Sequence, residues 1–160
     1  MLNLTIWRSN DVDSDHLTDI LASGDWRRLN DIDGFFAGVY KENQDIFLFC
    51  DRLGIYPLLY CTHNDRLFAA PSMAELLDTI PFEPTPSIEG VLSLFLFGHH
   101  VADETIFKEI HRCEGGQLIK YSLDTWEICR AKWRKPHTYR STSENSIEVR
   151  LTESFVQCIE

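Results

Sequence analysis

The chain has 160 residues, 44% of them hydrophobic, which suffices for one packed domain with the start of a second. Its formal net charge of −10 argues against binding to phosphate backbones or anionic membrane surfaces, so we expect neither nucleic acid nor membrane as a partner. The longest apolar run, around 91–97, is far shorter than the ~20 residues of a membrane span, and no signal peptide is visible.

The five cysteines indicate a reducing compartment. Their number is odd, no C-x-x-C pair occurs, and Cys50 and Cys61 lie in apolar runs where a thiol behaves as a small hydrophobic side chain. We therefore expect a cytoplasmic protein without a disulfide framework. Cys61 and His63 lie two residues apart on one expected strand, but a core thiol beside a strand-end histidine is a simpler interpretation than a catalytic pair.

The chain opens with residues 2–7, in which Leu2, Leu4 and Ile6 alternate with other residues and predict a strand at the edge of a sheet. A helix is expected next. Its residues 17, 20 and 21 are apolar and share one face, and Gly24 is placed to end it.

Two successive runs, 35–40 and 46–50, are apolar at both odd and even positions. A strand with one exposed face would alternate instead. The polar residues 41–45 between the runs are too few for a parallel crossover. We therefore expect an antiparallel hairpin that is covered on both faces, by helices or by a second sheet.

A second hairpin, 58–61 with 66–70, is predicted next, and Pro71-Ser72 begins a helix over Met73–Thr79. Prolines at 81, 84 and 86 form a rigid connector to a helix over Ile88–Phe97. This helix is apolar nearly all round, so we expect it to be deeply buried. Residues 117–122 and 126–133 predict the last pair of strands.

The end of the chain changes character. Residues 135–143 are polar and predict a linker. Beyond them Ile147, Leu151, Phe155 and Ile159 recur every four residues, the stripe of an amphipathic helix. The stripe still runs at residue 160, which predicts a fragment cut at the start of another domain.

Two patterns suggest metal binding but are incomplete. The acidic run Asp11-x-Asp13-x-Asp15 with Asp19 follows the spacing of an EF-hand loop, yet position 16 is His instead of Gly and position 22 is Ala instead of Glu. Acids at a helix N-terminus explain the run better. The adjacent histidines 99 and 100 point apart and have no third ligand at a useful spacing. We therefore expect no metal site.

Three stretches carry recognisable motifs: DGFFAGVY at 33–40, CDRLGIYPLLY at 50–60 and LFAAPSMAELL at 67–77. Together they resemble the L-x-G-x-F-A-F, R-D-x-x-G-I-x-P-L-Y and F-A-S-E-x-K-A-L stretches of the asparagine synthetase family, within its N-terminal glutaminase-like (class II glutamine amidotransferase) domain. TIFKEIHRCEGG at 105–116 and the pair 132–133 are similar to later segments of that domain. The resemblance assigns scaffold positions in these motifs to Gly34, Asp51, Arg52, Gly54 and Pro57.

The resemblance implies an α+β fold: the N-terminal-nucleophile (Ntn) hydrolase-type α-β-β-α sandwich of two antiparallel sheets, shortened at its N-terminus. It divides the chain into a glutaminase-like domain (1–134), a linker (135–143) and the first helix of a truncated synthetase (ATP-pyrophosphatase) domain (144–160). The synthetase domain would use ATP and Mg²⁺ to form an amide, whereas no cofactor is implied for this chain.

Features that glutamine hydrolysis requires in this family are not found. The family nucleophile is an N-terminal cysteine, whereas residue 2 is Leu. Residues 12–15 match the family's Ser-Asp-x-Glu best, and no Asn-Gly precedes them. By this match Asp13 would be the remnant of the carboxylate that binds the α-amino group of glutamine. Three further positions depart from the family pattern: Cys50 replaces Arg, Tyr56 replaces a common Lys, and Glu114 replaces the usual Pro.

We therefore expect no catalytic residue in this chain, because a missing nucleophile and oxyanion hole each remove orders of magnitude in rate. The expected role is structural, as part of an asparagine-synthetase-like, ATP-dependent ligase. The domain would dock on the synthetase domain of the same protein or support a homodimer. Two alternatives stay open: a truncated piece of an active glutamine-hydrolysing asparagine synthetase, and a stand-alone module that binds a small amino acid.

Overall fold

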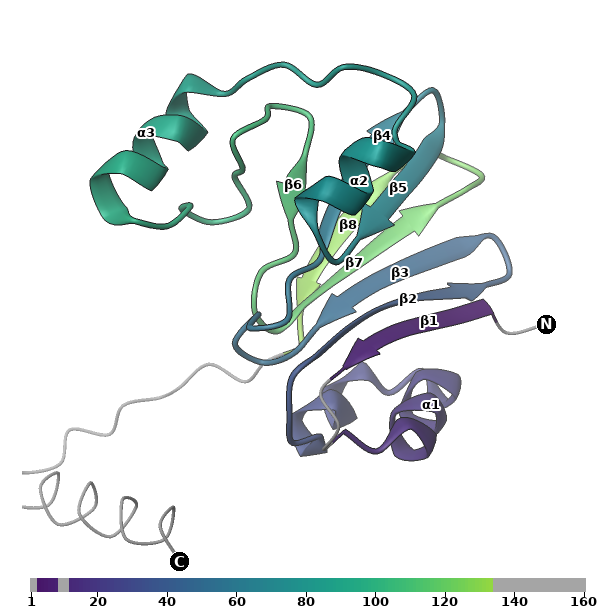
Figure 1. Cartoon of the computed structure of the whole chain (residues 1–160). Helices are drawn as coiled ribbons and strands as arrows, with labels where there is room; N and C mark the ends of the chain where they lie inside the picture. The colour runs from purple at the N-terminus through teal and green to yellow at the C-terminus, as the bar shows by residue number, and fades with distance from the viewer. Residues whose placement is uncertain (1–2, 9–11, 134–160) are drawn as a thin grey trace, which may run out of the picture.

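The computed structural model describes residues 3–8 and 12–133 (Figure 1). The predicted linker and closing helix lie outside the described residues. The helices and strands, in chain order, are β1 (Asn3–Arg8), α1 (Ser14–Ser23), the 3-10 helix η1 (Trp26–Asp31), β2 (Phe36–Glu42), β3 (Asp45–Cys50), β4 (Leu59–His63), β5 (Arg66–Ala70), α2 (Met73–Thr79), α3 (Ile88–Phe97), β6 (His111–Arg112), β7 (Gln117–Ser122) and β8 (Ile128–Lys132).

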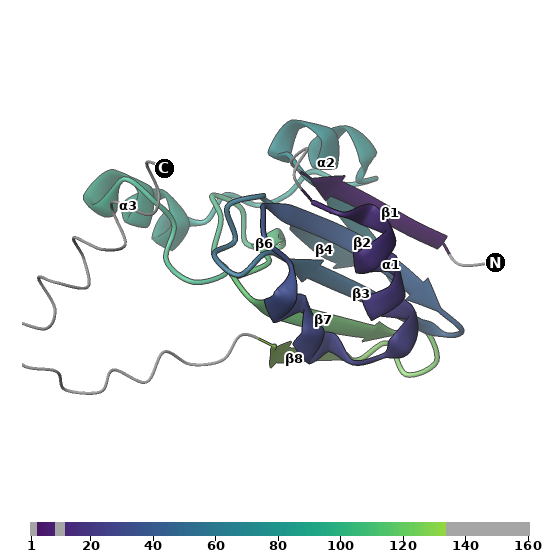
Figure 2. The ribbon, with the colours of Figure 1, turned by 90° about the horizontal axis from the view of Figure 1, so that it is seen from below.

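The strands form two antiparallel sheets. The larger has the order β1-β2-β3-β7-β8 and the smaller the order β5-β4-β6. β1 lies at one edge of the larger sheet, as its sequence pattern predicted. Helix α1 and η1 cover the outer face of the larger sheet (Figure 2), and α2 packs on the outer face of the smaller one (Figure 1). The expected α-β-β-α layering is confirmed.

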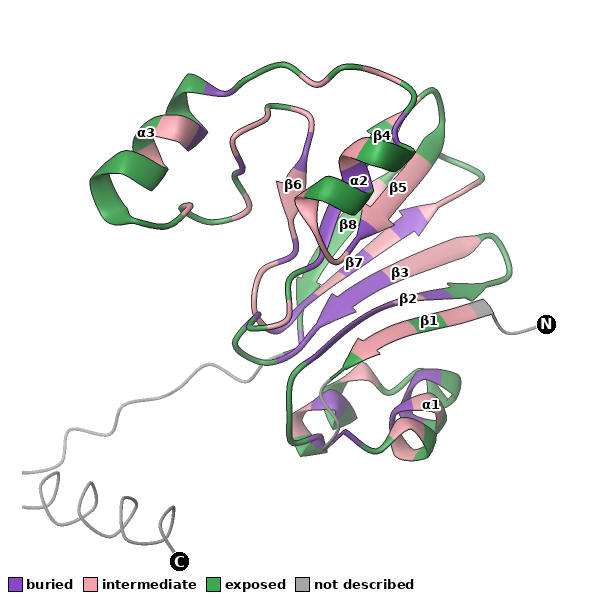
Figure 3. Ribbon diagram, viewed as in Figure 1, coloured by how far each residue is buried: buried purple, intermediate pink, exposed green. Residues whose placement is uncertain are grey.

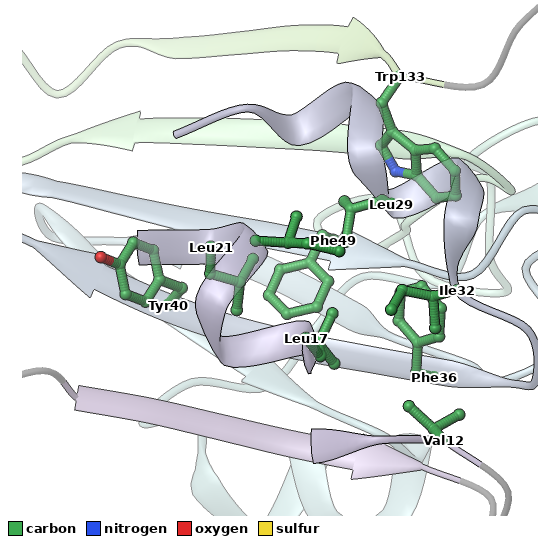
Figure 4. Close-up of a cluster of buried hydrophobic side chains, with 10 residues drawn as sticks. Val12, Leu17, Leu21, Leu29, Ile32, Phe36, Tyr40, Phe49 and Trp133 are labelled. Carbon is green, nitrogen blue, oxygen red and sulfur yellow. The ribbon is translucent and has the colours of Figure 1, made fainter. Parts of the chain in front are cut away.

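The two-sided burial of β2 and β3 explains their continuous apolar sequence. Phe36, Tyr40 and Phe49 point away from the smaller sheet and pack under α1 and η1 (Figure 4). Ala37 and Leu48 point the other way and pack against the smaller sheet. Because successive side chains of a strand face opposite sides, both sets of positions must be apolar when both sides are covered.

Helix α1 ends at Gly24, as the sequence predicted. Leu17, Ile20 and Leu21 are buried against the larger sheet. Gly24 follows the last turn with φ +70° and donates its N–H to the carbonyl of Leu21. This left-handed residue suits glycine, which has no side chain to oppose the conformation.

The prediction that Ile88–Phe97 is deeply buried is wrong. Within the described residues, the buried position of α3 is Gly90, whereas the large side chains are mostly exposed (Figure 3). The exposed fractions are 71% for Ile88, 51% for Leu92, 42% for Leu94, 82% for Phe95, 72% for Leu96 and 61% for Phe97. An apolar composition shows that a helix favours a covered environment, but it does not show where the cover comes from.

Candidate functional site

The loop between β3 and β4, residues 51–57 (the motif loop), is organised by the buried carboxylate of Asp51. This side chain is 1% exposed. It accepts the backbone N–H groups of Leu53 at 2.9 Å, Ile55 at 3.2 Å and Tyr56 at 2.9 Å. One carboxylate thus satisfies three loop donors, and charge-assisted bonds of this kind are stronger than neutral ones.

The motif loop packs closely against the segment 112–116. Gly54 has φ +67°, and a Cβ atom there would lie 2.9 Å from the backbone nitrogen of Gly115. Arg112 donates from Nη2 to the Gly54 carbonyl at 2.6 Å, and Gly116 donates its N–H to the Asp51 carbonyl at 2.8 Å. Glycine at position 54 is required both by the backbone conformation and by this close approach.

Arg52 and Asn30 connect the motif loop to η1 and to Trp133, which follows β8. The Arg52 guanidinium donates to the Asn30 carbonyl. Asn30 in turn donates from Nδ2 to the Trp133 carbonyl at 3.0 Å, and the Trp133 N–H donates to the Gly116 carbonyl at 3.0 Å. Segments that are distant in the sequence therefore meet in one junction, and the motif residues in it act through structural hydrogen bonds.

Two departures from the family pattern, at positions 50 and 114, are direct neighbours at this junction. The Cys50 thiol donates to the Glu114 carbonyl at 2.7 Å. The Glu114 carboxylate pairs with Lys132 Nζ at 2.8 Å. Positions 50, 114 and 132 are far apart in the sequence, so sequence reasoning could not show that these residues are coupled.

The buried cysteines Cys61 and Cys113 are not in environments that activate a thiol. Burial raises the pKa of Cys61 to about 11. A hydrogen bond with Cys50, together with burial, raises the pKa of Cys113. The nucleophilic form of cysteine is the thiolate, which a raised pKa disfavours at neutral pH. His63, near Cys61 in sequence, stacks on the ring of Phe82 with centroids 4.4 Å apart.

Asp13 has a structural role at the start of α1. Its Oδ1 accepts the N–H groups of Asp15 at 3.0 Å and His16 at 3.2 Å, the arrangement of a helix N-cap. In the described part of the chain, its hydrogen bonds stay within α1 and do not reach the motif loop. Gly34 lies just before β2 with φ +109°, and Pro57 ends the motif loop in an exposed position.

A polar cluster that sequence reasoning missed links the two sheets. Arg130 on β8 donates to the hydroxyl of buried Tyr60 on β4, from Nη2 at 2.9 Å and from Nε at 3.2 Å. Asp103 lies 3.5 Å from Arg130 Nη2 and 3.5 Å from His111 Nδ1. Burial raises the pKa of Tyr60, while Arg130 opposes the rise. The residues share no local motif that could have indicated this cluster.

No helix in residues 3–8 and 12–133 is long and apolar enough to cross a membrane. In the same residues, no three or more His, Cys, Asp or Glu side chains are grouped so that they could hold a metal ion. Asp11, the first member of the acidic run, lies outside the described residues.

Comparison with known proteins adds one match. The family model described as "Glutamine amidotransferase domain" matches residues 6–134. This range covers most of the chain, from within β1 to just beyond β8, and contains the whole junction around the motif loop. No protein of curated function shows a significant match to the chain.

Proposed function

The chain belongs to the glutamine amidotransferase domain family, and we propose that this member has lost glutamine hydrolysis and serves a structural, docking role. The observation that carries the proposal is the engagement of the motif residues. Asp51 is occupied by three loop N–H groups, and Arg52 is hydrogen-bonded to a backbone carbonyl. These side chains hold the scaffold together rather than presenting groups to a substrate.

The cysteine environments support the same proposal. A nucleophile needs a lowered pKa or a base within hydrogen-bond reach. Cys50, Cys61 and Cys113 are all buried, and the pKa values of Cys61 and Cys113 are raised. Asp13, the candidate for binding the α-amino group of glutamine, is already engaged as the N-cap of α1.

The parent protein in this proposal is an asparagine-synthetase-like, ATP-dependent ligase that forms an amide. This part of the proposal rests on the motif resemblance at 33–40, 50–60 and 67–77. ATP and Mg²⁺ would be bound by a separate synthetase domain, and the partner of the present domain would be that synthetase domain or a second copy.

Release of ammonia from glutamine tests the proposal. The purified chain, incubated with millimolar glutamine, is expected to release ammonia at the rate of a protein-free blank. A higher rate that disappears after treatment with a cysteine-directed glutamine analogue would overturn the proposed loss of activity. Calorimetric titration with glutamine and glutamate completes the test, because binding heat without ammonia would favour a small-molecule binding module.

A further inference from the structure

Helix α3 presents an apolar surface that the rest of the described chain does not cover. Ile88, Leu92 and Leu96 are spaced four residues apart, and Phe95 lies beside them one turn from Leu92. Each of these side chains is more than half exposed. Residues at this spacing lie on one side of a helix, so they form a continuous stripe. Exposed apolar patches of this kind mark interaction sites.

The helix is firmly attached along a different, narrow side. A Cβ atom at Gly90 would lie 1.8 Å from the Thr105 carbonyl oxygen, so helix and loop backbones are in direct contact there. Ser87 caps the helix by accepting the Gly90 N–H at 3.1 Å, and its own N–H donates to the Ile106 carbonyl at 2.8 Å. The remainder of α3 projects away from both sheets (Figure 1). The stripe is therefore held in place on a supported helix.

We propose that residues 144–160 of the same chain dock on α3 through their own apolar stripe, Ile147, Leu151, Phe155 and Ile159. The inference deepens the docking role proposed above and rests on it. Both stripes repeat every four residues, and rows of this spacing interdigitate when two helices pack. In helical form, residues 147–159 would extend about 18 Å and residues 88–96 about 12 Å, so the longer stripe can cover the shorter one.

The connection between Trp133 and the segment is long enough. The thirteen residues 134–146 can span about 43 Å when extended. A compact domain of this size has a radius of gyration of about 14 Å and is therefore about 36 Å across. The extended connection is thus longer than the domain is wide, and the described part of the chain ends on the side of α3, because Arg130 on β8 contacts Asp103 shortly after α3.

Tethering favours this occupant over a second copy of the chain. A segment joined to a domain by a connection of about this length has an effective concentration of the order of millimolar. A second copy would compete only at its free concentration, which is about a thousandfold lower in a micromolar solution. The same apolar surface is therefore expected to be filled within one chain first.

Paramagnetic relaxation measured by NMR tests the docking. A spin label is attached at Glu153→Cys, on the side of the segment opposite its stripe, in a Cys129→Ser/Cys158→Ser background. Cys50, Cys61 and Cys113 are buried and should not be labelled. The expected result is loss of amide signal intensity in residues 91–97, with β7 unaffected.

Two variants make the result specific. The double variant Phe95→Ser/Leu96→Ser changes highly exposed side chains, so the fold should persist while the intensity in α3 recovers. The matched control Leu53→Ser removes an apolar side chain that is 65% exposed elsewhere and should leave the intensity loss unchanged. Full intensity in α3 of the otherwise unmodified labelled chain would overturn the proposal.

Spin-labelled chain at natural isotope abundance is then mixed with ¹⁵N-enriched chain that carries no spin label. This mixture detects only contacts between copies and so separates them from contacts within one molecule. Intensity loss in α3 of the chain without a spin label would show contacts between copies and would also overturn the proposal, in favour of a second copy. The ammonia assay is independent of this experiment. If the chain releases ammonia and the segment docks on α3, only the proposed loss of activity is refuted. If the chain releases no ammonia and the segment does not dock, only the docking proposal is refuted.

Discussion

Replacement of Asp51 tests whether its carboxylate holds the motif loop. Asp51→Asn keeps one acceptor oxygen but turns an amide NH₂ toward at least one of the three N–H donors. A hydrogen bond to a charged group contributes about 1.5–3 kcal/mol, and an unsatisfied buried donor costs about 1–3 kcal/mol. We expect Asp51→Asn to lower the free energy of unfolding by about 2 kcal/mol and Asp51→Ala by about 4 kcal/mol.

Urea denaturation followed by tryptophan fluorescence measures this effect. With a slope of about 1–3 kcal/mol per molar urea, a loss of 2 kcal/mol lowers the midpoint by about 1 M. The matched control is Asp19→Asn, an exposed carboxylate on α1, which should change stability by less than about 0.5 kcal/mol. Equal midpoints for Asp51→Asn and Asp19→Asn would refute the structural role of the Asp51 carboxylate.

Three further predictions concern the scaffold. Gly54→Ala should lower the free energy of unfolding in urea by about 2–4 kcal/mol, because it adds a steric clash to backbone strain. The control Gly24→Ala, at a position with φ +70° and open space, should lower it by only about 1 kcal/mol. Equal losses would contradict the close packing of the motif loop. Burial raises the pKa of Cys61 from 9.0 to about 11, so the unfolded chain loses this proton first, and the contribution of Cys61 to stability should be constant below pH 9 and fall between pH 9 and 11. Cys61→Ala should remove up to about 1.4 kcal/mol per pH unit of that slope, and an unchanged slope would contradict the shift. A double-mutant cycle of Glu114→Gln and Lys132→Gln should give a coupling free energy of about 0.5 kcal/mol between the two side chains, and this coupling should vanish in ~1 M NaCl. A coupling that does not depend on salt would exclude a simple surface ion pair.

The sequence predicted the layers of the fold because burial leaves a direct trace in side-chain periodicity. Residues 35–40 and 46–50 are apolar on both sides, and both sides of β2 and β3 are covered. The same reasoning failed for Ile88–Phe97. An apolar sequence indicates that a surface favours burial, but the described residues leave most large side chains of α3 exposed.

The sequence indicated the position of the motif loop between two strands, but it did not indicate which interactions hold the loop together. The motif letters do not reveal that one carboxylate, Asp51, accepts three N–H groups. Asn30, which joins Arg52 to Trp133, was not singled out because it belongs to no motif and acts through backbone contacts. The link between Tyr60 and Arg130 joins two sheets across 70 positions, and no local pattern encodes such a pair.

The most direct test of the account is covalent capture with a diazoketone analogue of glutamine, which alkylates a cysteine that attacks the glutamine side-chain position. The chain is incubated with the analogue at neutral pH and then examined by intact and peptide mass spectrometry. We predict no adduct on Cys50, Cys61 or Cys113, because these thiols are buried. A stoichiometric adduct on one of them, formed by the folded chain and prevented by excess glutamine, would contradict the claim that the motif residues serve only the scaffold.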